Sequence, residues 1–587
     1  MSRTPRCTAC CATCCRPVRE SVADGAPAVR VQRDALMKPY FQSPRVPRPR
    51  ALPCAVLALA AACSAVRAQQ APAPMPPQPP QAVFPIKGFA INGENPLGSG
   101  ETSAILAPFL RADATLDVLQ RATAALEKAL HDRGYSLYRV VLPPQPLADT
   151  ITLNIVRFTL AKVQLQGNGT HFDDDNVRAA LPELREGTSP NLRRLARETA
   201  VANENPSRQL VVALRQSEAE DSIDATVRIT EQAPWSFGVG WNNHGTSETG
   251  RDRFTVSGSY NNLFNRDHVL GMAYTTSLQH PSRVKQVGLT YRAPLYRWGG
   301  VAFASYVDSD VTGTFGLDAT NTQYDTFRST AAGHVFKLGY SYYFVPDGGY
   351  RSYLTLAWED KVYKATEIEG VATDQRDRRS RPLSIAYVGR IEAERQLLTY
   401  SAELAANLGG GSGNTLSAYR TENDQIDTIH WKALRGSATF FRAMASGWQF
   451  LARGQAQWSP DLLLAGEAFG LGGVGSIRGV PDRVLYGDSG ASLTLEGITP
   501  AWIAGLRGLA FVDAGLIRSD LADLPTRRRK DRLASVGLGL RYEHPRGLHV
   551  SAEYGYVVSG SRADPDENPS VPEKGDDKLH VNLSLVF

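Results

Sequence analysis

The chain has 587 residues, so several domains or one very large domain are expected. Aromatic residues make up 9% of the chain and charged residues 21%, which is typical of neither a disordered nor a nucleic-acid-binding protein. The net charge of +5 comes from the first 68 residues, because beyond them 53 basic residues face 56 acidic ones. A uniformly basic surface for nucleic acid is therefore excluded.

The N-terminal region carries the pattern of a secretory signal peptide over residues 37–68. Basic residues follow Met37, an alanine-rich apolar run covers residues 51–66, and small residues lead to Ala68. The apolar run is too short to span a bilayer as a helix. We expect cleavage after Ala68 and translation from Met37, so that residues 1–36 are a mis-assigned extension.

All cysteines lie in this N-terminal region: Cys7, Cys10, Cys11, Cys14, Cys15, Cys54 and Cys63. The spacing in "CTACCATCC" would suit zinc, but no later Cys or His cluster completes such a site. Cys63 weakly resembles a lipoprotein cleavage site, which we rank below cleavage after Ala68. We therefore predict no metal site.

Residues 69–83 are a proline-rich linker, and the next two segments share one order of elements. Segment 84–157 predicts a strand, helices that include one capped by Thr115, and a strand pair; the expected apolar stripe is Leu116, Leu119, Leu126 and Leu130. Segment 158–232 repeats the β-α-α-β-β order, with Ser189 expected as the cap of its second helix and Pro190 at the first helical position.

Residues 233–587 alternate apolar and polar side chains in segments of about ten residues separated by turn residues. The last of them places Leu579, Val581, Leu583, Leu585 and Phe587 on one face. A soluble β-sandwich gives the same alternation. The number of segments, their aromatic ends and the signal peptide favour an all-β transmembrane barrel of about 16 antiparallel strands, beginning near Trp235.

Two motifs stand out inside this region. "GGVGSIRGV" (472–480) places a single cation, Arg478, among glycines. "FVDAG" (511–515) lies on a predicted strand whose alternation turns Ala510, Val512, Ala514 and Leu516 to lipid. Asp513 is thus expected to face the barrel lumen, where a guanidinium can hold a carboxylate by two parallel hydrogen bonds.

The repeated segment resembles the POTRA domain, and two such units before a barrel ending in Phe resemble the two-partner secretion transporters. This resemblance implies that a surface loop folds into the lumen and that its arginine pairs with an aspartate in F-x-D-x-G. The implied loop residues are Gly472, Gly473, Ser476, Ile477, Arg478 and Gly479, and the implied partner residues are Phe511, Asp513 and Gly515. Val480 departs from the family, which has an aromatic residue there, and the mature N-terminus is too short for the plug helix of some members.

The resemblance implies an outer-membrane pore with POTRA-like domains in the periplasm that capture an unfolded partner and export it. The partner would be a large secreted β-helical protein of the haemagglutinin or haemolysin kind, and the barrel assembly machinery would insert the barrel into outer-membrane lipid. The implied assembly signal is Leu583, Leu585 and Phe587. The Arg478–Asp513 pair could serve as a static brace or as a moving gate.

Other functions remain as alternatives. An assembly factor for other barrels would carry more POTRA units, and a passive porin would not need residues 84–232. "GLGGVG" (470–475) lacks the βαβ unit of a dinucleotide site, and "GDSG" (487–490) lacks a triad. We therefore predict no enzyme activity, no catalytic residue, no cofactor and no nucleic-acid partner.

Overall fold

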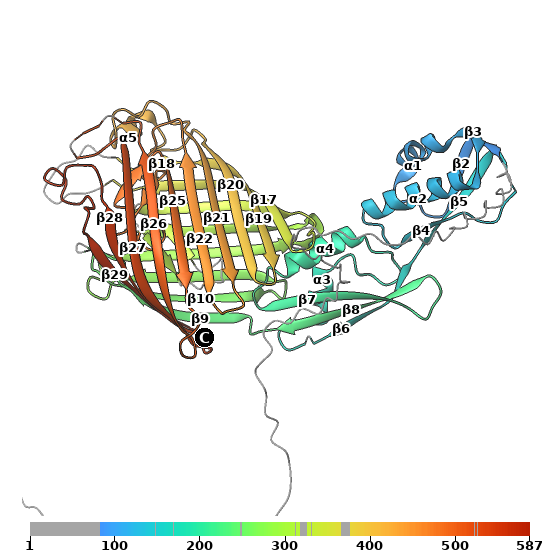
Figure 1. Cartoon of the computed structure of the whole chain (residues 1–587), viewed down its shortest axis with the longest axis horizontal. Helices are drawn as coiled ribbons and strands as arrows, with labels where there is room; N and C mark the ends of the chain where they lie inside the picture. The colour runs from blue at the N-terminus through green and yellow to red at the C-terminus, as the bar shows by residue number, and fades with distance from the viewer. Residues whose placement is uncertain are drawn as a thin grey trace, which may run out of the picture. The chain divides into compact units, whose positions relative to one another are not determined.

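The computed structural model describes residues 83–587, except 147, 168, 247–248, 312, 317–325, 330–331, 366–375, 522 and 525. The predicted extension, the signal peptide and the linker up to residue 82 lie outside the described residues. Two small α+β modules are followed by a closed β-barrel (Figure 1). No helix in the described part of the chain is long and apolar enough to cross a bilayer.

The first module packs α1 (Gly98–Leu106) and α2 (Leu116–Asp132) against a three-stranded sheet of order β2-β5-β4. The sheet consists of β2 (Gly88–Asn92), β4 (Tyr138–Val141) and β5 (Thr150–Arg157), while β1 (Phe84–Ile86) and β3 (Arg111–Ala114) pair in a separate two-stranded sheet. Thr115 precedes α2 as predicted. Leu119, Leu126 and Leu130 are buried, but Leu116 was wrongly placed in the apolar stripe, because at the first position of the helix it is exposed.

The second module repeats this arrangement. Its sheet has the order β6-β8-β7, in which β6 runs parallel and β7 antiparallel to the central strand β8. Its elements are β6 (Thr159–Gln166), α3 (Asp174–Ala180), α4 (Leu192–Ala202), β7 (Arg208–Gln216) and β8 (Ser222–Glu231). In both modules the last strand is central, so each sheet ends in two edge strands.

The start of α4 differs from the prediction. Asn191, and not Ser189, caps the helix: its side-chain oxygen accepts hydrogen bonds from the backbone N–H groups of Arg193 and Arg194, both at 3.1 Å. Pro190 therefore precedes the cap. Both Ser and Asn are favourable caps, and two satisfied donors fix the start at Leu192.

Glu198 is expected to make the stability of the second module depend on pH. This residue of α4 is buried, and burial raises the pKa of its carboxyl from 4.5 to about 8, partly offset by the N–H of Glu183. The folded module holds the proton more tightly than the unfolded chain does. Its contribution to stability is therefore full below about pH 4.5, is lost as the pH rises towards 8, and stays constant above that.

A fragment of residues 84–232 should accordingly unfold at a lower temperature at pH 8 than at pH 5. Glu198→Gln should remove most of this difference, because the amide does not titrate. Thermal unfolding followed by circular dichroism measures both. An equal pH dependence in the variant would assign the effect to other groups.

The barrel is formed by antiparallel strands that follow one another around its wall (Figure 1). They are β9 (Trp235–Asn242), β10 (Arg253–Leu263), β11 (His268–Thr276), β12 (Lys285–Leu295), β13 (Gly300–Ser309), β16 (Gly333–Tyr343), β17 (Tyr350–Tyr363), β18 (Arg378–Ser380), β19 (Pro382–Ala393), β20 (Gln396–Asn407), β21 (Lys432–Ala443), β22 (Gln449–Trp458), β25 (Ser489–Ile498), β26 (Leu506–Arg518), β27 (Lys530–Glu543), β28 (Leu548–Ser559) and β29 (Asp577–Val586). The short β18 and the long β19 both pair with β17 on either side of Arg381 and occupy one position. With β18 and β19 counted as one, the described residues form a barrel of 16 strands.

Pairing of β29 with β9 closes the barrel, so the wall has no open edge in lipid. Along β26, Ala510, Val512, Ala514 and Leu516 are exposed on the outer face, while Phe511 and Asp513 are buried on the inner one. The alternation thus turns polar side chains inward, and the functional residues are to be sought in the lumen.

Candidate functional site in the barrel lumen

One long loop, residues 459–488, joins β22 to β25 and folds back against the inner wall; we call it the lumen loop. It contains a short hairpin of β23 (Phe469–Leu471) and β24 (Leu485–Gly487), and the glycine-rich motif lies between these strands. Ile477 and Val480 are fully or almost fully buried against the wall side chains of Ile517, Leu533 and Val557. Valine at position 480 therefore packs in an apolar cluster that joins the loop to the wall.

Glycines make the turn of this loop. Gly472 and Gly473 have φ angles of +120° and +81°, in the region that favours glycine. The Ser476 hydroxyl accepts a hydrogen bond from the Gly472 N–H at 2.8 Å and contacts its carbonyl oxygen at 3.0 Å. The turn is thus held by its own hydroxyl and presents the following residue, Arg478, to the wall.

Arg478 forms a two-point contact with Asp513. Its Nε lies 2.8 Å from Oδ2 and its Nη2 lies 2.8 Å from Oδ1, and its backbone N–H donates to Oδ2 at 3.0 Å. The arginine is 1% exposed and the aspartate 0%. The bidentate contact holds the Arg478 side chain, and the backbone hydrogen bond holds the main chain at the tip of the loop, residues 477–480.

Two further carboxylates meet the same guanidinium. Arg478 Nη1 lies 2.7 Å from Glu496 on β25 and 2.8 Å from Glu553 on β28, and Arg541 on β27 bridges these two glutamates. The site therefore holds three carboxylates and two guanidinium groups. Withdrawing the loop would leave three acids with one cation, and an unpaired buried charge costs about 3–5 kcal/mol.

The loop backbone also approaches the wall directly. A Cβ atom at Gly555 would lie 2.5 Å from the Gly479 nitrogen, so a side chain there would displace the loop. The Gly479 N–H donates to Nε2 of His580, 3.1 Å away. A Cβ at Gly515 would likewise lie 2.5 Å from the side chain of Leu471. Small residues on the wall thus make room for the loop.

The structure brings the predicted loop motif and the predicted strand motif together at the inner wall. Phe511, the first residue of the strand motif, places its ring 3.4 Å from the Arg478 guanidinium carbon and adds a cation–π contact. Sequence reasoning did not select the other members of the site: Glu496, Arg541, Glu553 and His580. Glu553 and His580 alternate with apolar residues along β28 and β29, and this alternation is the signal in the sequence that could have found these two.

The predicted C-terminal residues lie elsewhere, on the outer face of the barrel. Leu583 and Leu585 are paired with Trp241 and Val239 of β9. The Phe587 N–H donates to the Phe237 carbonyl at 2.8 Å, and their rings stack with centroids 6.2 Å apart. These residues therefore complete the seam that closes the barrel.

Removing Phe587 should lower the amount of folded protein in the outer membrane, because the closing strand loses its terminal pair and the residue implied to be read during assembly. Heat-modifiable mobility on gels measures the folded barrel. Phe264→Ala is a matched control, since it removes another exposed phenylalanine, from the turn between β10 and β11. Equal folded levels in both variants would argue against an assembly role.

The two other motifs, which match a dinucleotide-binding string and a serine-protease string, lie in the lumen loop and at its junction with β25. "GLGGVG" runs from β23 into the loop turn, and "GDSG" spans the end of β24 and the start of β25. In the part of the chain that the structure describes, no group of three or more His, Cys, Asp or Glu side chains could hold a metal ion.

Comparisons with known proteins place these features in context. The model of the haemolysin secretion/activation proteins of the ShlB/FhaC/HecB type matches residues 222–542, and the model of the ShlB-type POTRA domain matches residues 84–157. The outer membrane transporter CdiB of Escherichia coli is 22% identical over 453 residues, which cover 75% of this chain and 74% of the relative. CdiB of Dickeya dadantii is 22% identical over 450 residues, with 74% and 76% covered.

Solved structures share the fold. CdiB from Escherichia coli superposes with a TM-score of 0.64 at 19% identity, covering 88% of this chain and 94% of that one. CdiB from Acinetobacter baumannii gives 0.62 at 16% identity, with 86% and 90% covered. The predicted fold class, a POTRA-type region before a barrel of 16 antiparallel strands, is confirmed.

Proposed function

The chain belongs to the ShlB/FhaC/HecB family of haemolysin secretion/activation proteins, and we propose that it captures one unfolded partner in the periplasm and exports it through the barrel lumen. Membership makes it an outer-membrane two-partner secretion transporter with periplasmic POTRA domains and a secreted partner. The family resemblance predicted from the sequence is thereby confirmed. The observation that supports the finer proposal is the lumen loop, attached to the wall by Arg478 and Asp513.

The lumen loop gives the pore a structured interior. Its tip residues Ile477, Arg478 and Val480 are buried against the wall, so the loop lines the route of an exported chain at a fixed place. The ion pairs around Arg478 fix the location of the loop more than they stabilise the fold, because desolvation offsets much of the gain from buried ion pairs. We infer that the pair keeps the loop on the wall while the partner passes.

The edge strands of the POTRA-type modules supply the means of capture. The second module ends in β6 and β7, and an extended peptide can add to such an edge through backbone hydrogen bonds. This mode tolerates many side chains, which suits an unfolded partner. Val211 on β7 is 56% exposed and is a suitable probe position.

A photo-crosslinking amino acid at Val211 should form an adduct with the partner when export is arrested in cells. The same probe at Leu110, which is exposed in the first module but lies outside its named strands, is the matched control. An adduct of equal yield at both positions would contradict edge pairing, since contact would then not depend on a strand.

The partner is inferred to be a large β-helical protein of the haemagglutinin or haemolysin kind. Folding outside the cell would supply the driving force, because the sequence contains no phosphate-binding loop of the P-loop type and the periplasm lacks ATP. We also propose that residues 37–68 direct export of this chain, that the barrel assembly machinery inserts it into outer-membrane lipid, and that it performs no catalysis and binds no nucleic acid.

A further inference from the structure

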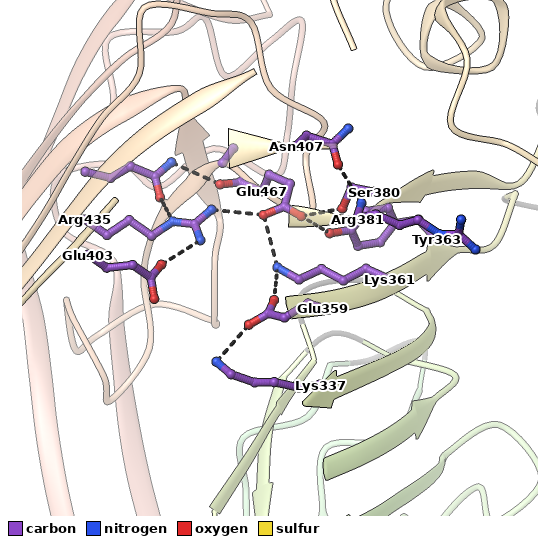
Figure 2. Close-up of polar contacts among 12 residues, drawn as sticks. Lys337, Glu359, Lys361, Tyr363, Ser380, Arg381, Glu403, Asn407, Arg435 and Glu467 are labelled. Carbon is purple, nitrogen blue, oxygen red and sulfur yellow. Dashed lines mark hydrogen bonds and ion pairs between the residues drawn. The ribbon is translucent and has the colours of Figure 1, made fainter. Parts of the chain in front are cut away.

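A second buried ionic site lies on the lumen loop, away from the tip. Glu467 is 3% exposed, and both of its carboxylate oxygens have two partners (Figure 2). Oε1 accepts from the Tyr363 hydroxyl at 2.8 Å and from the Ser380 hydroxyl at 2.6 Å. Oε2 lies 2.9 Å from Arg435 Nη2 and 3.2 Å from Lys361 Nζ. All four partners belong to wall strands.

Glu467 is the central link of a line of alternating charges, as Figure 2 shows. Neighbours along the line are between 2.7 and 3.2 Å apart. In order, the line contains Lys337, Glu359, Lys361, Glu467, Arg435 and Glu403. Five members belong to the wall and one to the loop. Without the loop carboxylate, Lys361 and Arg435 would each keep only one carboxylate partner, Glu359 and Glu403, so the wall itself favours the loop in place.

The backbone at Glu467 is held as well. Gln457 Nε2 donates to the Glu467 carbonyl at 3.0 Å, and Gln457 Oε1 accepts from Arg435 Nε at 3.0 Å. Arg435 thus binds the side chain of Glu467, and Gln457, which is hydrogen-bonded to Arg435, binds its main chain. This arrangement parallels the tip, where Asp513 binds the side chain and the backbone of Arg478.

We propose that Glu467 is a positioning residue that attaches the stem of the lumen loop, the part around residues 465–468, to the wall independently of Arg478, so that loss of either attachment releases only its own part of the loop. Among the residues that the structure describes, the contacts of Glu467 and those of Arg478 have no residue in common. Glu467 contacts β17, β18 and β21, whereas Arg478 contacts β25, β26 and β28. Their polarity is reversed: at the stem a loop acid meets wall cations, and at the tip a loop cation meets wall acids. The consequence for export rests on the proposed function.

Cysteine labelling tests this proposal on the purified full chain in detergent, with the native cysteines, all at or before residue 63, replaced by serine. Two reporters differ little in size from the native residue: Ala468→Cys at the stem and Val480→Cys at the tip, which are 7% and 2% exposed. A maleimide reacts with a buried thiol only when the segment opens, so the labelling rate reports local release.

Glu467→Gln should raise the labelling rate at position 468 by roughly tenfold or more and leave that at 480 within about twofold. Arg478→Lys should do the reverse. Glu403→Gln is the matched control, because it removes a carboxylate from the same Arg435 but none from the loop, and it should leave both rates near those of the parent. Heat-modifiable mobility verifies that each barrel is folded.

An unchanged rate at 468 in Glu467→Gln would overturn the proposal. Equal release of both positions by either variant would also overturn it, because the loop would then open as one unit. If Glu467→Gln does not fold, the Tyr363→Phe/Ser380→Ala variant removes both Oε1 donors without altering charge, and it should raise the rate at 468 by at least about threefold; no rise would count against the stem attachment. Labelling requires no partner, so a failure of the export proposal would leave these outcomes unaffected.

Discussion

A chain lacking residues 84–232 should reach the outer membrane as a folded barrel and secrete no partner. The barrel strands begin at Trp235, and each POTRA-type module has its own hydrophobic core, so the deletion removes both modules and leaves every strand of the barrel wall. Capture of the unfolded partner is assigned to their edge strands, and no other described part of the chain is proposed to perform it. Secretion is measured by immunoblotting the culture medium, and barrel folding by heat-modifiable mobility.

The control for this deletion is a shorter one within the predicted linker, residues 72–80, which should leave secretion close to that of the parent chain. Both variants shorten the segment that follows the predicted signal peptide, but only one loses the modules. Undiminished secretion by the 84–232 deletion would reject a role of the modules in capture.

The barrel and the inward orientation of Asp513 could be predicted because each depends on local sequence. Alternation along β26 is enough to turn Asp513 inward, and a lone arginine among glycines marks a tight turn that approaches a wall. The Arg478–Asp513 contact itself came from the family resemblance, since spacing alone does not say which two of many inward charges meet.

The rest of the site depends on strand register across the barrel. Glu496, Arg541 and Glu553 converge because β25 to β28 pair in one particular alignment, and a shift of one residue would turn each of them to lipid. Glu467 escaped prediction for a similar reason. It lies in a loop without periodicity, and its four partners come from three strands.

The cap of α4 shows the same limit at short range. Ser189 and Asn191 are both good N-caps, and the sequence pattern of Ser followed by Pro favours the first. The structure selects Asn191, whose side chain also donates to the backbone carbonyl of Arg133 in the first module. Ser189 and Asn191 are both acceptable caps by local sequence, and the one that caps the helix also makes a hydrogen bond outside it.

Arg478→Lys should reduce secretion by at least about tenfold while the barrel remains folded. The ammonium keeps the charge but cannot make the planar two-point contact with Asp513 and also reach Glu496 and Glu553. The loss of one partner from a buried pair costs about 3–5 kcal/mol when no charge replaces it, so lysine should recover part of that and not all of it. Asp513→Asn should have a similar effect, because the amide has no negative charge for the guanidinium.

Arg541→Lys is the matched control for this experiment. Arg541 contacts the same Glu496 and Glu553 but belongs to β27, so this substitution weakens the site without releasing the loop, and secretion should fall much less.

Exchanging the charges of residues 478 and 513 is a further test. In a simple ion pair, the exchange would restore the contact. Here an aspartate at 478 would face Glu496 and Glu553, so the exchanged double variant should secrete no better than either single variant. Recovery by that variant would show that the two glutamates do not share the site, and equal secretion by the Arg478 and Arg541 variants would show that attachment of the loop is not what export requires.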